Sequence, residues 1–242
     1  MTTLVVTPIE FDGTEVEIHG DAYHHLFRVK RLRAGESVRV VDGEGRARGG
    51  VVARVDRAHG VVAFGAALPS LEPALAVELL VAPPRAERAA WLVEKATELG
   101  VTAIRWIASA RAARDDSAWS HAQLARLRRV AIAAVEQCGR AVVPEITGGR
   151  ELQECFEQLD LAPRPIVVLD AGGATGPPPA APGGEPPGLT IVVGPEGGWT
   201  DDELALFARA GAPRWSLGER VLRVETAAIA AAGIVLAAGS TG

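Results

Sequence analysis

The sequence predicts a chain of two parts, a small β domain followed by a larger α/β domain with a mostly parallel sheet. Up to about residue 68 it shows short β-like runs broken by glycine and aspartate turns. Residues 68–73 contain two prolines and are typical of a linker. Beyond them, runs of strand length alternate with segments of helical periodicity, as in sheets covered by helices. We therefore expect domains at residues 1–70 and 74–242.

The composition indicates a globular protein. At 242 residues with 48% hydrophobic content, the chain is long enough to bury sizeable cores. Residues 1–10 lack a basic region followed by an apolar run, and no apolar stretch is long enough to span a bilayer, so we expect a cytoplasmic protein. Cys138 and Cys155 are too few for a disulfide framework and lack zinc-type spacing, so we expect reduced thiols and no metal.

In the first domain we expect strands at residues 4–6, 37–42, 50–55 and 60–64, forming a small β-barrel or open sandwich. Residues 24–32 are the one helix-like interruption. This segment contains four basic side chains within six residues, at Arg28, Lys30, Arg31 and Arg33. Such a cluster can bind phosphates by releasing counterions, although a solvated surface has the same composition. The net charge of −5 does not exclude nucleic acid, because residues 151–242 carry 12 acidic and 5 basic side chains and hold most of the acidity.

The second domain begins the alternation of strands and helices. We expect strands at 77–82, 104–108, 166–170, 190–193 and 214–217, with helices at 87–99, 119–139, 151–159, from 200, and at the apolar C-terminus. Gly100 is a typical C-terminal helix stop. Thr200 and Glu203 form the pattern of a capping box, in which each satisfies an amide of the other.

Two glycine-rich stretches compete for the role of ligand site. Residues 167–176 resemble the motif of Rossmann-like methyltransferases, but only 66 residues follow, too few for the additional units of that fold. We therefore read 171–188, with six prolines and six glycines, as a flexible loop that forms no packed element.

The second stretch, residues 191–203, reads as a strand, a tight turn and a capped helix. Its glycines let the backbone approach a ligand closely. A further loop at 217–227 also leaves a strand and enters a helix. Because α/β sheets bind ligands at the carboxyl ends of adjacent strands, these loops predict a binding crevice.

Several separated blocks resemble the ribosomal RNA small subunit methyltransferase E family, the uridine-N3 methyltransferases of the SPOUT class. They cover nearly the whole chain in family order: His24-His25-Leu26 with 28–33, 94–101, 136–140 with 144–146, 194–198, and 217–227. The resemblance implies a PUA-like RNA-binding β-barrel, then a SPOUT domain whose chain forms a trefoil knot, and a homodimer that builds the active site at its interface. It implies S-adenosylmethionine as cofactor and methylation of N3 of a uridine in 16S ribosomal RNA, in the assembled small subunit, without metal or membrane.

The resemblance also assigns residues. The cofactor is expected at Leu169, Gly194, Pro195, Glu196, Gly197, Gly198, Leu217, Gly218, Leu222, Thr226 and Ala227. RNA contacts are expected at His25, Arg28, Lys30, Arg31, Arg33, Arg111 and Arg140. Methylating N3 requires removing a ring proton and stabilising the anion, so Arg223 is the candidate for the charge and Glu225 for accepting the proton or orienting Arg223. The alternative for both is a salt bridge at the start of a helix.

The chain departs from the family at two places. Val224 stands where the family usually has threonine, and Ser109-Ala110-Arg111-Ala112 replaces Ser-Glu-Arg-Ser.

Two other functions stay open. An RNA-binding assembly factor without catalysis is disfavoured by the intact loops at 194–198 and Arg223, and a transfer RNA methyltransferase by the family blocks outside the knot.

Overall fold

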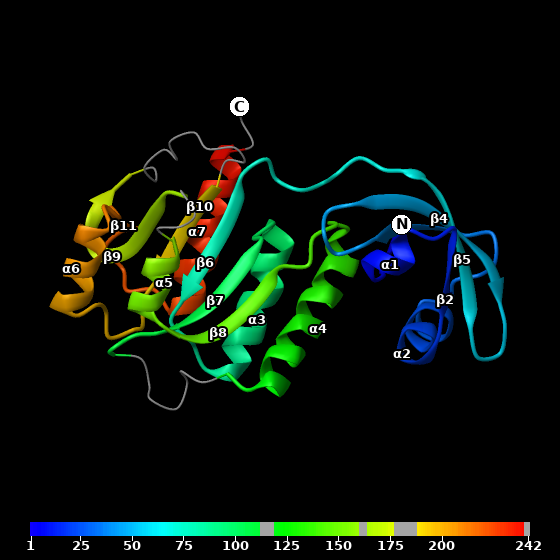
Figure 1. The fold of residues 1–242 in the computed structure, drawn as a ribbon, viewed down its shortest axis with the longest axis horizontal. Helices are drawn as coiled ribbons and strands as arrows, with labels where there is room; N and C mark the ends of the chain where they lie inside the picture. Colours follow the sequence, from blue (N-terminus) through cyan, green and yellow to red (C-terminus); the bar gives the residue numbers. More distant parts are fainter. Residues whose placement is uncertain (112–118, 160–163, 177–187, 240–242) are drawn as a thin grey trace. The chain divides into compact units, whose positions relative to one another are not determined.

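The computed structural model describes residues 1–111, 119–159, 164–176 and 188–239. The chain forms two compact units, a first unit of residues 1–72 with 132–143 and a second unit of residues 73–131 with 144–242 (Figure 1). Helix α4 (His121–Cys138) contributes its beginning to the second unit and its end to the first. Within the described ranges, no helix combines the length and apolar character needed to cross a bilayer.

The first unit is built on a five-stranded sheet in the order β1-β3-β4-β5-β2. Its strands are β1 (Thr2–Val5), β2 (Glu15–Ile18), β3 (Ser37–Val41), β4 (Ala47–Val55) and β5 (Gly60–Ala67), and only the β1–β3 pair is parallel. Its short helices are α1 (Pro8–Phe11), α2 (Gly20–Tyr23) and the π-helix η1 (His24–Val29). The expectation of a single helix-like segment was wrong, because α1 and α2 are one-turn helices too short for a periodic signal. Strand β2 was missed because its alternation is only four residues long.

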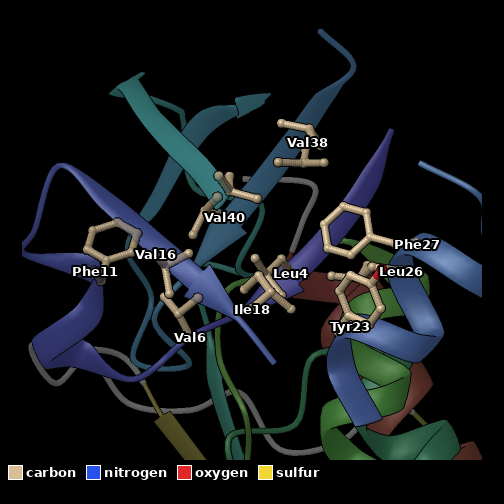
Figure 2. Packing of buried hydrophobic residues seen from close by; sticks show 12 residues of the cluster. Leu4, Val6, Phe11, Val16, Ile18, Tyr23, Leu26, Phe27, Val38 and Val40 are labelled. Carbon is tan, nitrogen blue, oxygen red and sulfur yellow. The ribbon is translucent and has the colours of Figure 1, made fainter. Parts of the chain in front are cut away.

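Apolar side chains from the sheet and from α2–η1 form the core of the first unit, as Figure 2 shows. Phe27 of η1 lies directly over Gly60, where an added Cβ would come within 2.4 Å of its ring. The glycine at the start of β5 therefore allows η1 to pack closely on the sheet.

Residues 132–143 complete the first unit. Val135 and Ala141 pack against Val41 and Ala47 in a second apolar cluster. Beside them Arg140 Nη2 donates to Glu72 Oε2 at 2.7 Å, with side-chain exposures of only 5% and 15%. Glu72 also accepts the amide N–H groups of residues 141 and 142, so the turn after α4 is anchored by one half-buried carboxylate.

The second unit contains a six-stranded sheet in the order β11-β9-β10-β6-β7-β8, parallel throughout. The strands are β6 (Ala76–Val81), β7 (Ala103–Ala108), β8 (Glu145–Glu151), β9 (Ile166–Thr175), β10 (Gly188–Val193) and β11 (Arg214–Ser216). The predicted class, a β domain followed by a parallel α/β domain, is confirmed.

Helices cover both faces of this sheet. Helices α5 (Leu152–Leu159) and α6 (Asp201–Arg209) pack through Phe156 and Phe207 on an apolar cluster that includes Leu80, Val168 and Val192. Helices α3 (Ala86–Leu99) and α7 (Val224–Gly239) pack on each other, and α7 also contacts β10 and β6 (Figure 1). Gly100 ends α3 at φ 109°, as predicted.

The expectation that residues 171–188 form no element was wrong at both ends. Strand β9 continues to Thr175, and β10 begins at Gly188, while residues 177–187 lie outside the described ranges. Gly173 explains the extension of β9, because an added Cβ would stand 2.7 Å from the backbone of Arg214 and Trp215 in β11. Strand β8 was also missed, since its two glycines are unfavourable in strands. Gly148 is needed there because a Cβ would come within 3.0 Å of Trp119.

Candidate functional site

A cavity of about 290 Å³ lies beside β9 and the two loops that follow β10 and β11. We call residues 169–171, which lie within β9, the first segment, residues 194–199 the second loop and residues 217–223 the third loop. All three line the cavity, together with Val193, Trp215, Ser216 and Ala227. Because parallel strands point their carboxyl ends to one edge, this is where an α/β sheet commonly binds a ligand.

The second loop folds back tightly on its own tryptophan. Trp199 is 6% exposed and lies against Gly194, where an added Cβ would be 2.7 Å from the indole ring. The same indole donates through Nε1 to the carbonyl oxygen of Leu169 at 2.9 Å. Trp199 thus links the second loop to the first segment, in β9. Gly198 adopts φ 69°, a left-handed conformation that glycine accepts without strain.

The predicted capping box is confirmed at the start of α6. Thr200 Oγ1 accepts from the amide of Glu203, and Glu203 Oε2 accepts from the amide of Thr200 at 2.8 Å. The other oxygen of Glu203, Oε1, accepts from the amide of Ala110 at 3.0 Å. The segment after β7 is therefore attached to the second loop through the cap of α6.

Arg111 also reaches the second loop. Its Nη1 donates to the carbonyl oxygens of Gly197 at 2.8 Å and Trp199 at 3.1 Å. The neighbouring position Ala112, where the family usually has serine, lies outside the described residues. At Ala110 the family's glutamate is absent, but the contact seen here uses the backbone amide, which every residue except proline provides.

The two candidate catalytic residues have different surroundings. Arg223 is exposed, and no ion pair joins it to a carboxylate within the described part of the chain. Glu225 is 5% exposed, and its Oε1 accepts from Nη1 of Arg88 in the first turn of α3. Among the described residues, its Oε2 has no hydrogen-bond partner. Glu225 therefore does not orient Arg223 in this structure. Val224 between them is buried, so that departure from the family lies in the packed first turn of α7 and not in the cavity.

Ten of the eleven cofactor positions expected from the resemblance meet around this cavity, and Thr226 alone is not a lining residue. Sequence reasoning missed several others that line it, namely Asp170, Ala171, Val193, Trp199, Trp215, Ser216, Arg220 and Val221. Arg220 and Val221 lie inside the third block of the family resemblance, so their position in that loop was the available signal. Val221 is 88% exposed at the rim, although it is aliphatic.

The expected RNA contacts of the first unit lie on or after η1 and are exposed, at His25, Arg28, Lys30, Arg31 and Arg33. Arg28 lies over the ring of Tyr23, 5.5 Å from its centroid, and donates to the carbonyl oxygen of Arg57. Arg31 has φ 58°, which turns the chain out of η1. Because most of this basic segment faces solvent, its charges are accessible to a polyanion.

Glu136 and Arg140, near the end of α4, are less exposed than this basic segment. Burial raises the pKa of Glu136 above its usual range, opposed by Lys30, by a bond from the backbone of Val5 and by His25. Arg140, which was expected to contact RNA, is 4% exposed and binds Glu72. Its guanidinium is therefore not presented to solvent, and we no longer count it among the candidate RNA contacts.

Comparisons with known proteins identify the class and then the family. An RNA methyltransferase domain model matches residues 71–236, and an RNA methyltransferase PUA domain model matches residues 18–62. This is an RNA methyltransferase fold with an N-terminal PUA-like domain. Ribosomal RNA small subunit methyltransferase E of Mycobacterium tuberculosis is 34% identical over 235 residues, covering 92% of this chain and 86% of the relative. The same enzyme of Synechocystis is 30% identical, covering 93% and 73%. The chain belongs to the ribosomal RNA small subunit methyltransferase E family.

Solved structures agree with this assignment. Ribosomal RNA small subunit methyltransferase E of Neisseria gonorrhoeae, bound to S-adenosylmethionine, superposes with a TM-score of 0.83 at 26% identity, covering 100% of this chain and 97% of that one. A methyltransferase of Legionella pneumophila in complex with the same cofactor gives a TM-score of 0.79 at 27% identity, covering 98% and 97%.

Proposed function

We propose that this protein transfers a methyl group from S-adenosylmethionine to small-subunit ribosomal RNA, at N3 of a uridine. The observation that carries the proposal is the cavity beside β9 and the loops that follow β10 and β11, which is lined by ten positions that the family resemblance assigns to the cofactor. Family membership supports the cofactor and the class of RNA. The N3 position rests on the resemblance alone.

The lining residues fit the cofactor chemically. A volume of about 290 Å³ is at the lower end of the range for small-molecule sites. Leu169, Leu217 and Leu222 offer apolar surface for a flat purine ring, while glycines expose backbone groups for its polar edge. Glu196 and Arg220 also line the cavity and suit the ammonium and carboxylate groups of an amino acid. When bound, S-adenosylmethionine supplies an electrophilic methyl group.

The protein's own contribution is to hold the uracil and its developing charge. We assign Arg223 to the negative charge that spreads over the uracil carbonyl oxygens when N3 loses its proton, because this arginine is exposed at the end of the third loop. Glu225, the residue expected to accept the proton, is 5% exposed and does not line the cavity, and its Oε2 is buried, so we do not assign it the proton. Its other oxygen is bound to Arg88, which fixes the carboxylate at the start of α7.

The remaining roles follow the family resemblance. We propose that residues 1–70 bind RNA through His25, Arg28, Lys30, Arg31 and Arg33, that residues 74–242 carry catalysis, and that the enzyme acts in the cytoplasm on the assembled subunit. A homodimer is supported by apolar side chains left exposed on the paired helices α3 and α7, Trp91 at 44%, Leu99 at 37% and Ile234 at 46%. The trefoil knot stays a prediction.

The decisive experiment is methyl transfer in vitro followed by nucleoside mass spectrometry. Purified protein and labelled S-adenosylmethionine are incubated with small ribosomal subunits, naked 16S RNA or transfer RNA. We expect 3-methyluridine in the subunits, with Arg223→Ala reducing the rate at least a hundredfold, in the range seen when a charge-stabilising donor is removed. A different methylated nucleoside would refute the N3 assignment, and binding of subunits without any transfer would favour an assembly factor.

A further inference from the structure

The segment that follows β7 contacts the second loop through a side chain and the start of α6 through a backbone amide. Arg111 donates to the carbonyl oxygens of Gly197 and Trp199 at 2.8 and 3.1 Å. In the same direction, the amide of Ala110 donates to Glu203 Oε1 at the start of α6, at 3.0 Å. These contacts join parts of the chain that lie more than 80 residues apart in sequence.

The contacts fix two peptide planes of the second loop at both ends. In the Gly197–Gly198 peptide, the carbonyl oxygen accepts from Arg111 and the amide of Gly198 donates to Pro195 at 2.9 Å. In the Trp199–Thr200 peptide, the carbonyl oxygen accepts from Arg111 and the amide of Thr200 donates to Glu203 at 2.8 Å. Since a peptide group is planar, holding both ends determines its orientation.

The effect extends to the first segment, in β9. The residue whose carbonyl Arg111 holds, Trp199, donates its indole N–H to the carbonyl oxygen of Leu169 at 2.9 Å. Gly197, Trp199 and Leu169 all line the cavity, whereas Arg111 does not. Arg111 therefore acts on the shape of the cavity from outside it.

We propose that Arg111 is a positioning residue for the cofactor loops and not an RNA contact. The family resemblance led to the expectation of an RNA contact at Arg111, and the residue is exposed. Both of its observed hydrogen bonds, however, go to the second loop, and a charged donor bonded to two carbonyls holds them more strongly than a neutral one. The inference rests on the proposed function, because it assumes that the cavity binds S-adenosylmethionine.

Calorimetric titration of S-adenosylmethionine into the purified full-length protein tests this. We expect Arg111→Ala to raise the Kd about tenfold or more, because two hydrogen bonds from a charged donor are lost. Arg111→Lys should fall between wild type and alanine, since an ammonium group keeps the charge but lacks the planar fork. Arg209→Ala is the matched control. It removes an arginine from the surface of the same unit, at the end of α6, and should leave the Kd within twofold.

Affinity for purified small ribosomal subunits is measured in parallel. A positioning role predicts that subunit affinity changes less than twofold and that the KM for S-adenosylmethionine rises more than kcat falls. An unchanged cofactor Kd together with weaker subunit binding would overturn the proposal in favour of an RNA contact. If Arg111→Ala does not fold, Arg111→Lys decides, and a cofactor Kd equal to wild type overturns the proposal. Failure of the wild-type protein to bind the cofactor would instead refute the proposed function.

Discussion

Gly194→Ala should destabilise the second unit through a single steric contact. The added Cβ would be 2.7 Å from Cε2 and 2.8 Å from Cζ2 of Trp199, so the indole ring must move. It has little freedom, because its ring meets Phe207 edge-on at 4.8 Å and its Nε1 is bound to Leu169. Overpacking costs roughly 1–3 kcal/mol and a lost buried hydrogen bond about 1 kcal/mol more, so we expect about 2–4 kcal/mol. For a unit of this size that lowers Tm by on the order of 5–15 °C.

Gly197→Ala is the matched control, because it makes the same change in the same loop. Its Cβ would meet Arg111 at 3.4 Å, an ordinary contact, so we expect less than about 0.5 kcal/mol. Urea unfolding followed by tryptophan fluorescence measures both variants, and cofactor titration shows whether the Gly194 variant also binds weakly. Equal unfolding midpoints for the two variants would refute the steric argument, since only position 194 faces the indole.

Two further predictions concern the first unit. Glu72→Ala should cost roughly 3–5 kcal/mol, because it removes the carboxylate that neutralises the buried Arg140, and a loss below about 1 kcal/mol in urea unfolding would contradict this. Glu136→Gln should stabilise the protein at pH 8 but not near pH 4. Burial raises the folded pKa of Glu136 despite the opposing charges of Lys30 and His25, so its contribution to stability is present at low pH and is lost as pH rises through that pKa. An equal difference between variant and wild type at both pH values would contradict the assignment.

Features determined by local sequence were predicted well, and features determined by distant contacts were not. The end of α3 at Gly100 and the capping box of Thr200 and Glu203 depend on residues within one helical turn, so pattern reasoning found them. The extension of β9 depends on Gly173 meeting a strand about 40 residues later, and no local rule indicates it. The high glycine content of residues 171–176 is typical of a loop, so a loop was predicted there.

The site shows the same division. The second and third loops were identified from strand, glycine and helix order, because each loop is continuous in sequence. The hydrogen-bond partners of single charged residues were not identified from the sequence. Glu225 binds Arg88, 137 positions earlier, and Arg140 binds Glu72, 68 positions earlier. From its charge alone, such a residue is expected to bind a partner of opposite charge. Whether that partner is RNA, the cofactor or another side chain depends on the tertiary structure.

The discontinuity of the first unit affects how this chain folds during synthesis. Residues 132–143 provide Val135, Ala141 and the cation that neutralises Glu72, so the unit cannot close when residue 72 leaves the ribosome. About 70 further residues must be translated, which takes several seconds or more at typical elongation rates. During that interval the apolar surface of Val41 and Ala47 stays uncovered and accessible to chaperones. A fragment that ends in the proline-containing segment should for the same reason be unstable, whereas one that ends after residue 143 retains every part of the first unit.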